Sequence, residues 1–191
     1  MQIVLASASP RRRELLMQLG LPCLVVPSNA EELSDGEPAA LVQENALRKV
    51  MDVQQRHLGA VVLGADTVVV CRGEILGKPD NPDEACRMLR TLSQRWHTVT
   101  TGVAVANAEV RRTFWVDTQV KFRELSAQDV HEYVASSEPL DKAGAYGIQG
   151  LGGMFVEQIK GCYYNVVGLP LPRLVIELER QFGFSVWELR T

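Results

Sequence analysis

The amino-acid sequence predicts an α/β fold in which helices flank a mixed sheet. Short apolar runs typical of buried strands alternate along the chain with segments of helical spacing. Helix-start patterns such as Ser9-Pro10 and Asn81-Pro82 separate these runs. Residues 114–122 alternate apolar and polar side chains, which is the pattern of a half-buried strand. Interleaved strands and helices of this kind are characteristic of α/β proteins.

The first half of the chain begins with an expected buried strand at residues 3–6. Ser9 and Pro10 then occupy the N-cap and first helical positions of a helix that Gly20 ends. The other elements expected in this half are a strand at 23–26, an acidic loop at 28–37, a helix at 38–56, a strand at 60–63, and a hairpin of strands 68–71 and 74–76.

The second half opens with a well-defined helix start. Asn81 stands at the N-cap, Pro82 at the first helical position and Glu84 at the third, so we expect a helix as far as Leu92. The other elements expected here are strands at 98–106 and 114–122, a helix at 127–136 capped by Ser126, a glycine-rich segment at 143–153, strands at 154–159 and 162–166, and a last helix from Pro172 to residue 182.

Length and composition limit the class of protein. The chain has 191 residues, close to the size of one domain, with 46% hydrophobic and 23% charged residues. The net charge of −3 argues against a nucleic-acid coat or a polybasic membrane binder. No stretch approaches the ~20 apolar residues of a membrane span, and the amino-terminal residues lack the charged region of a signal peptide. We therefore expect a cytoplasmic protein.

A basic turn follows the first strand. Arg11, Arg12 and Arg13 occupy the first turn of the expected helix, where the helix dipole disfavours each cation by ~0.3–1 kcal/mol at exposed sites. A bound anion would remove this conflict, because free N–H groups, the hydroxyls of Ser7 and Ser9 and the guanidinium groups form a phosphate cradle. A solvated basic turn is the alternative.

Two acidic segments are candidates for metal binding. Asp66 lies in Gly-Ala-Asp-Thr within an apolar run, where an unpaired carboxylate is costly, so it is expected to meet a cation, a metal or a helix N-terminus. Glu31 and Glu32 in the acidic loop, together with Asp66, offer hard oxygen ligands for Mg²⁺ or Mn²⁺. The alternatives are a structural aspartate in a turn between two strands and an acidic loop that is only solvated.

Two lysines and an amide complete the set. Lys49 lies on the expected helix at 38–56 and Lys78 in Gly-Lys-Pro, and each alone would pass for a surface residue. The glycines at 143–153 suggest a loop whose backbone closely approaches another group, with Gln149 able to donate and accept at a base edge. A flexible loop is the alternative. The chain thus offers candidate phosphate-binding residues, candidate metal-binding carboxylates and an amide that could read a base, but no Ser/His/Asp arrangement for nucleophilic catalysis. This combination suits metal-assisted attack of water on a phosphoanhydride.

Taken together, these motifs resemble the Maf family of nucleotide pyrophosphatases, in the branch similar to dTTP/UTP pyrophosphatases. The resemblance covers roughly residues 3–172. Its matching segments are Leu-Ala-Ser-Ala-Ser-Pro-Arg-Arg at 5–12, Glu31-Glu32, Lys49, Gly-Ala-Asp-Thr at 64–67, Gly-Lys-Pro at 77–79, the run 141–150 and Asn-Val-Val-Gly-Leu-Pro at 165–170.

The resemblance implies hydrolysis of nucleoside triphosphates to the monophosphate and pyrophosphate, with a divalent metal. It implies that Asp66 is the catalytic proton acceptor and also binds the metal with Glu31, although the Glu31-Glu32 doublet leaves this register open by one. It further assigns phosphate binding to Ser7, Arg12, Lys49 and Lys78, and base selection to Arg11, Thr67 and Gln149.

The resemblance also implies a Maf/Ham1-like fold, with residues 1–191 forming one domain of two lobes around a central cleft, and a homodimer. Two rivals remain open: a nucleotide-binding regulator of cell division with little catalysis, and a pyrophosphatase for another modified nucleotide such as 7-methyl-GTP. A nucleic-acid-binding module is disfavoured by the acidic balance and by the lack of aromatic residues between basic ones.

Overall fold

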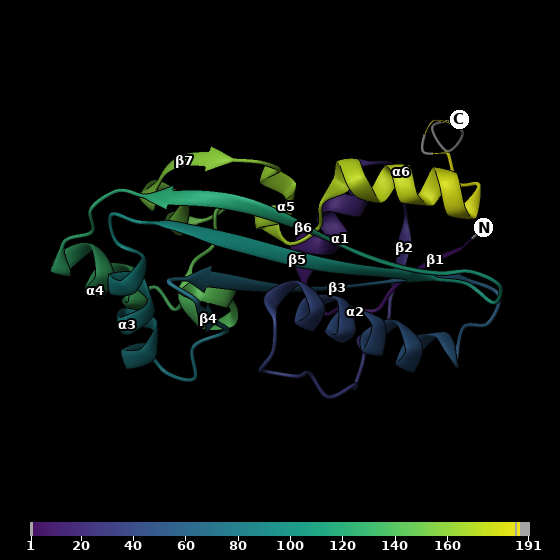
Figure 1. Cartoon of the computed structure of the whole chain (residues 1–191), viewed down its shortest axis with the longest axis horizontal. Helices are drawn as coiled ribbons and strands as arrows, with labels where there is room; N and C mark the ends of the chain where they lie inside the picture. Colours follow the sequence, from purple (N-terminus) through teal and green to yellow (C-terminus); the bar gives the residue numbers. More distant parts are fainter. Residues whose placement is uncertain (1, 186, 188–191) are drawn as a thin grey trace. The chain divides into compact units, whose positions relative to one another are not determined.

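The computed structural model describes residues 2–185 and 187 and has a mixed seven-stranded sheet flanked by helices (Figure 1). The strand order is β2-β1-β3-β5-β6-β7, and β4 pairs with β3. The predicted α/β fold class is confirmed. None of the described helices combines the length and apolar character needed to cross a membrane.

The chain divides into two compact units. Unit 1 contains residues 1–66, 101–116 and 168–191, and unit 2 contains residues 67–100 and 117–167. The boundary passes between Asp66 and Thr67, and the long strands β3, β5 and β6 each contribute to both units. The ends of the domain predicted at 1–191 lie outside the described residues, and the cleft between lobes stays a prediction.

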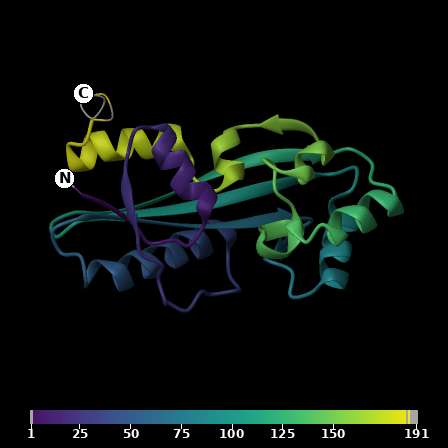
Figure 2. The same cartoon turned by 180° about the vertical axis from the view of Figure 1, so that it is seen from behind.

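In unit 1, β1 (Ile3–Leu5) lies between β2 (Cys23–Val25) and β3 (Val61–Cys71), and both pairings are parallel. Helix α2 (Pro38–Gln54) covers one face of these strands, whereas α1 (Pro10–Gln18) and α6 (Leu171–Phe182) lie on the other (Figures 1 and 2). Beneath α2, an apolar core joins helix and sheet; its members include Val4, Val62, Ala46 and Val50.

Two glycines allow α2 to approach the sheet closely. A Cβ atom at Gly64 of β3 would lie 2.8 Å from the Ala46 carbonyl oxygen and 2.8 Å from Cγ2 of Val50. A Cβ at Gly102 of β5 would lie 2.6 Å from the backbone nitrogen of Gln43. Because real Cβ contacts are not this short, any larger residue would push the helix away from the strands.

Unit 2 has its own core, built from strands, helices and short turns. Its elements are β4 (Glu74–Leu76), α3 (Pro82–Leu92), β7 (Val156–Lys160), α4 (Ala127–Ala135), α5 (Tyr163–Val167), the 3₁₀ turns η1 (Glu138–Asp141), η2 (Ala143–Ala145) and η3 (Leu151–Phe155), and parts of β3, β5 (Trp96–Ala106) and β6 (Arg111–Phe122). The predicted helix starts are confirmed: the Asn81 side chain accepts from Glu84 N–H, and Ser126 forms a capping box with Asp129.

Two predicted features are wrong in an informative way. The strands predicted at 60–63 and 68–71 are parts of one continuous strand, β3, which begins at Val61, so Asp66 lies in mid-strand rather than in a turn. The strand predicted at 162–166 is replaced by helix α5. There, buried Asn165 donates to the Val99 carbonyl and to Thr118 Oγ1, and these tertiary bonds override the β-propensity of the tyrosines and valines.

Smaller differences concern the ends of elements. The strand expected at 154–159 is Val156–Lys160, and the glycine-rich segment folds into the turns η2 and η3 instead of an open loop. Strand β5 begins two residues earlier than expected, at Trp96, and the last helix begins at Leu171 instead of Pro172. Fraying of this size is usual where caps are weak.

Candidate functional site

The candidate site begins where β1 ends. Ala6 N–H donates to the Leu63 carbonyl (2.7 Å), so the chain that leaves β1 runs beside the middle of β3. Buried Ser7 follows, and its Oγ accepts from Ser9 N–H (3.3 Å) and from Nη1 of Arg12 (3.1 Å). Because two donors hold this hydroxyl, its position is fixed at the carboxyl end of a strand, where α/β proteins bind ligands.

Arg12 is held on both sides of its guanidinium group. Nη1 donates to Ser7, and Nε donates to the carbonyl of Gly168 (2.9 Å). Burial lowers the pKa of Arg12, while the negative charges of Asp66 and Glu32 oppose this shift. Arg12 therefore shares one electrostatic neighbourhood with two acidic side chains and remains a fixed cation.

Asp66 lies in the centre of this neighbourhood. Its Oδ1 is 2.8 Å from the Lys49 ammonium, and Lys49 is also 2.8 Å from Oε1 of Glu32. Asp66 and Lys49 are both 8% exposed, so their attraction is only weakly screened by water. Of the three partners predicted for the Asp66 carboxylate (a cation, a metal or a helix N-terminus), the structure shows a cation, Lys49.

Asn45 is a site residue that the sequence motifs did not indicate. This buried side chain on α2 donates from Nδ2 to Oδ2 of Asp66 (3.0 Å) and to the Leu33 carbonyl (3.0 Å), and its Oδ1 accepts from Leu33 N–H (2.8 Å). It therefore links the catalytic candidate to the acidic loop. Its spacing from Lys49, four residues on one helix face, is the pattern that could have revealed it.

The acidic loop is anchored on α2. Asp52 accepts from the hydroxyl of Ser28 (3.0 Å) and the N–H of Asn29 (2.9 Å), and Asn45 holds Leu33. Between these anchors Glu31 and Glu32 are both exposed, and the Glu32 carboxylate is the one that reaches the Lys49 ammonium. Of the two glutamates, Glu32 is therefore the one whose carboxylate lies with Asp66 on a shared cation, and the metal-binding role given to Glu31 stays a prediction.

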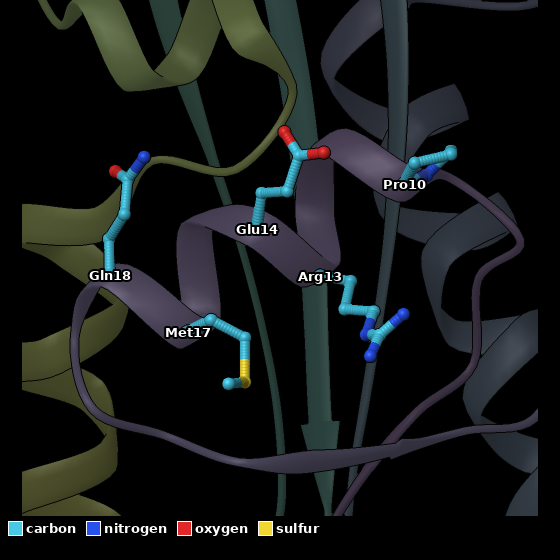
Figure 3. Close-up of a pocket in the computed structure, with 5 residues that line it drawn as sticks. All are labelled: Pro10, Arg13, Glu14, Met17 and Gln18. Atoms are coloured by element: carbon cyan, nitrogen blue, oxygen red, sulfur yellow. The ribbon is translucent and has the colours of Figure 1, made fainter.

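The outer face of α1 lies outside this constellation. Helix α1 carries a surface pocket of about 610 Å³ that is lined by Pro10, Arg13, Glu14, Met17 and Gln18 (Figure 3). None of the predicted site residues lines it. Of the three arginines in the first turn, Arg12 therefore joins the acidic site and Arg13 lines the separate pocket; Arg11 is partly buried, and its charge contributes to lowering the pKa of Arg12.

The other three predicted residues belong to unit 2. Thr67 follows Asp66 in β3, so its side chain points to the opposite face of the strand from Asp66. Lys78 and Gln149 are exposed, and their two segments are joined by a hydrogen bond from Gly144 N–H to the Gly77 carbonyl (3.0 Å). The structure thus brings Ser7, Arg12, Lys49 and Asp66 together in unit 1, and Lys78 and Gln149 onto linked segments in unit 2.

Comparison with known proteins decides the family. The family model described as Maf-like protein matches residues 2–181. The chain belongs to the Maf family.

Individual relatives cover nearly the whole chain. It is 53% identical over 190 residues to a dTTP/UTP pyrophosphatase of Moorella thermoacetica, with 97% of each protein aligned. It is 52% identical over 188 residues to the protein of that name from Gloeobacter violaceus, covering 97% of this chain and 98% of the relative. For the dTTP/UTP pyrophosphatase of Bacillus cereus the identity is 49% over 187 residues, with 97% of each aligned.

The donor set of this Maf chain fits a divalent cation that is shared with substrate phosphates. Within the described residues, no group of three or more His, Cys, Asp or Glu side chains could hold a metal alone. However, Glu32 and Asp66 both direct a carboxylate oxygen at one cation, the Lys49 ammonium. One or two carboxylates completed by water and phosphate oxygens form the usual Mg²⁺ environment, so the two residues suit a metal that arrives with a nucleotide.

Proposed function

We propose that this Maf-family chain is a nucleoside triphosphate pyrophosphatase that hydrolyses dTTP and UTP to the nucleoside monophosphate and pyrophosphate. The observation that carries this proposal is the Asp66 carboxylate, held between Lys49 and Asn45 beside the fixed guanidinium of Arg12. Relatives about half identical over 97% of the chain are named for this reaction.

Asp66 would act as the proton acceptor. A water molecule attacks the α-phosphorus and its proton passes to an oxygen of Asp66. The bond from the α-phosphorus to the oxygen that bridges to the β-phosphate breaks, and pyrophosphate leaves. Lys49 and Asn45 already hold one oxygen of Asp66 each, so the carboxylate is oriented before substrate binds. Such preorganisation provides much of the rate acceleration in reactions of this kind.

The cationic residues would neutralise the phosphates. Arg12 presents a fixed guanidinium whose fork matches phosphate oxygens, and Ser7 adds a hydroxyl beside it. Lys49 and the exposed Lys78 contribute two further positive charges. Glu32 and Asp66 would hold Mg²⁺ or Mn²⁺, which when bound supplies additional charge neutralisation at the phosphates.

Base selection would lie with Arg11, Thr67 and Gln149. Gln149 is exposed, and within the described part of the chain its amide has no hydrogen-bond partner, so it can donate and accept at the edge of a pyrimidine. We further propose that the protein works in the cytoplasm as a homodimer and binds neither nucleic acid nor membranes, in keeping with a net charge of −3.

A nucleotide panel tests the proposal. The purified chain is incubated with dTTP, UTP, CTP, GTP and 7-methyl-GTP in the presence of Mg²⁺ or Mn²⁺, and the products are separated. We expect monophosphate and pyrophosphate, with dTTP and UTP preferred. Release of diphosphate and inorganic phosphate would mean that a different bond is cut. A preference for 7-methyl-GTP would identify the chain as a pyrophosphatase for that modified nucleotide. Nucleotide binding without turnover would favour a nucleotide-binding regulator with little catalysis.

A further inference from the structure

The glycine-rich segment of unit 2 is wrapped around two side chains, Glu138 and Tyr133. The Glu138 carboxylate accepts from Leu151 N–H (2.9 Å), from Gly152 N–H (3.3 Å) and from the Tyr133 hydroxyl (2.9 Å). The same hydroxyl accepts from Gly147 N–H (3.1 Å). One carboxylate and one phenol therefore satisfy three backbone N–H groups between residues 147 and 152.

The glycines are required by this internal contact. A Cβ at Gly150 would lie 2.5 Å from Oε2 of Glu138, and one at Gly152 would lie 2.5 Å from the Tyr133 oxygen. A Cβ at Gly147 would lie 2.7 Å from Cε of Lys142. The expected close approach of this backbone to another group is thus present, and that group is the protein's own Glu138 and Tyr133.

Glu138 is suited to this task electrostatically. Burial by itself raises the pKa of its carboxyl group, but hydrogen bonds from Leu151, Gly152 and Tyr133 outweigh burial and lower the pKa. The side chain is therefore ionised at neutral pH, and hydrogen bonds to a charged acceptor are stronger than those to a neutral one. The Tyr133 ring packs edge-on against Phe155 (5.0 Å between centroids), which fixes the phenol from the other side.

Gln149 lies in the short stretch between these attachment points, with tethers at Gly147 before it and at Leu151 and Gly152 after it. Its own side chain is exposed and contributes nothing to the tether. We propose that Glu138, supported by Tyr133, is a positioning residue for base selection: it fixes the backbone that presents Gln149 to the nucleotide base. This inference rests on the proposed function, in which Gln149 contacts the base.

Glu138→Gln is the direct test, because it keeps the size of the side chain and removes its charge. We expect the ratio of kcat/KM for UTP to that for GTP to fall by about tenfold, the scale of one lost charged hydrogen bond. Hydrogen exchange of residues 147–153 should become faster. The control is Glu132→Gln on α4, an exposed glutamate whose side chain accepts from Gln128 and from no other side chain among the described residues, and it should change neither quantity.

A second variant separates positioning from general damage. In a Gln149→Ala background, the further substitution Glu138→Gln should leave the UTP to GTP ratio unchanged, because the residue that Glu138 positions is absent. A ratio that falls equally in both backgrounds would overturn the proposal, as would wild-type selectivity in Glu138→Gln. Failure of the wild-type chain to hydrolyse dTTP or UTP would instead refute the proposed function. In that case hydrogen-exchange rates of residues 147–153 would test whether Glu138 holds this segment, and the relative binding of UTP and GTP would test the base preference.

Discussion

Replacement of Asn45 by alanine tests the construction of the catalytic centre. The variant loses one hydrogen bond to the buried Asp66 carboxylate and two to the Leu33 backbone. A bond to a charged group contributes about 1.5–3 kcal/mol and a neutral bond about 0.5–1.5 kcal/mol. Leu33 is 40% exposed, so water can replace much of the hydrogen bonding that its backbone loses. Asp66 is only 8% exposed, so water replaces the hydrogen bond lost by its carboxylate less easily.

The expected loss in the free energy of unfolding is therefore about 2–4 kcal/mol, or roughly 5–15 °C in Tm for a chain of this size. The expected fall in kcat is about 10–100-fold, because one of the two groups that orient the proton acceptor is gone. KM for UTP should change little, since Arg12 keeps its own partners Ser7 and Gly168.

Fixed-time assays of UTP hydrolysis measure kcat and KM, and urea denaturation of the same variant measures the free energy of unfolding. The matched control is Gln43→Ala on the same helix, because this amide donates to the Ala39 carbonyl and not to Asp66. It should keep kcat near the wild-type value. Wild-type kcat in a folded Asn45→Ala variant would refute the reasoning, since Asp66 would then be positioned without Asn45.

Three further outcomes are expected. Asp66→Asn should lower kcat by at least about 10²-fold while calorimetry still detects nucleotide binding, and full turnover would remove Asp66 from the mechanism. Gln149→Glu should weaken the preference for UTP over GTP with inhibition by pyrophosphate unchanged; an unaltered preference would contradict base contact by Gln149. Burial lowers the pKa of His97 to about 4, so between pH 6.5 and 4 the unfolded chain binds the proton first and stability falls with decreasing pH, by up to about 3 kcal/mol. In urea titrations, His97→Gln should flatten this slope, and an identical slope in variant and wild type would show that other groups cause it.

Local patterns were sufficient for much of the fold. The helix start at Asn81 and the capping box at Ser126 depend on residues three positions apart, so the chain itself contains all the information. Strand β3 was divided in two because Gly-Ala-Asp-Thr has the composition of a turn. In the structure β3 pairs with β1 at residues 61–63 and is hydrogen-bonded to β5 on its other side, and neither partner lies within a local window of sequence around Asp66.

The candidate site likewise divides into residues that local sequence indicates and residues that only long-range contacts reveal. Arg12 and Asp66 carry charges in unusual surroundings and could be selected from the sequence, whereas Lys49 was indicated only by the resemblance to the Maf family. Asn45 offers only its four-residue spacing from Lys49 as a signal and Glu138 offers none, because each looks like an ordinary polar residue until the fold brings it against a distant segment. Asn45 meets Asp66 across 21 residues, and Glu138 meets Leu151 across 13. Residues that orient others are recognised by their contacts and not by their chemistry alone.

The chain passes between the two compact units at four peptide bonds, one of which joins Asp66 to Thr67. Of the residues proposed for chemistry and phosphate binding, only Lys78 lies in unit 2, whereas two of the three residues proposed for base selection, Thr67 and Gln149, belong to unit 2, which has a core of its own. Substitutions at Gln149 can therefore change the base preference without disturbing the packing around the catalytic carboxylate. A family built in this way can diversify its substrates during evolution while it retains a single hydrolytic reaction.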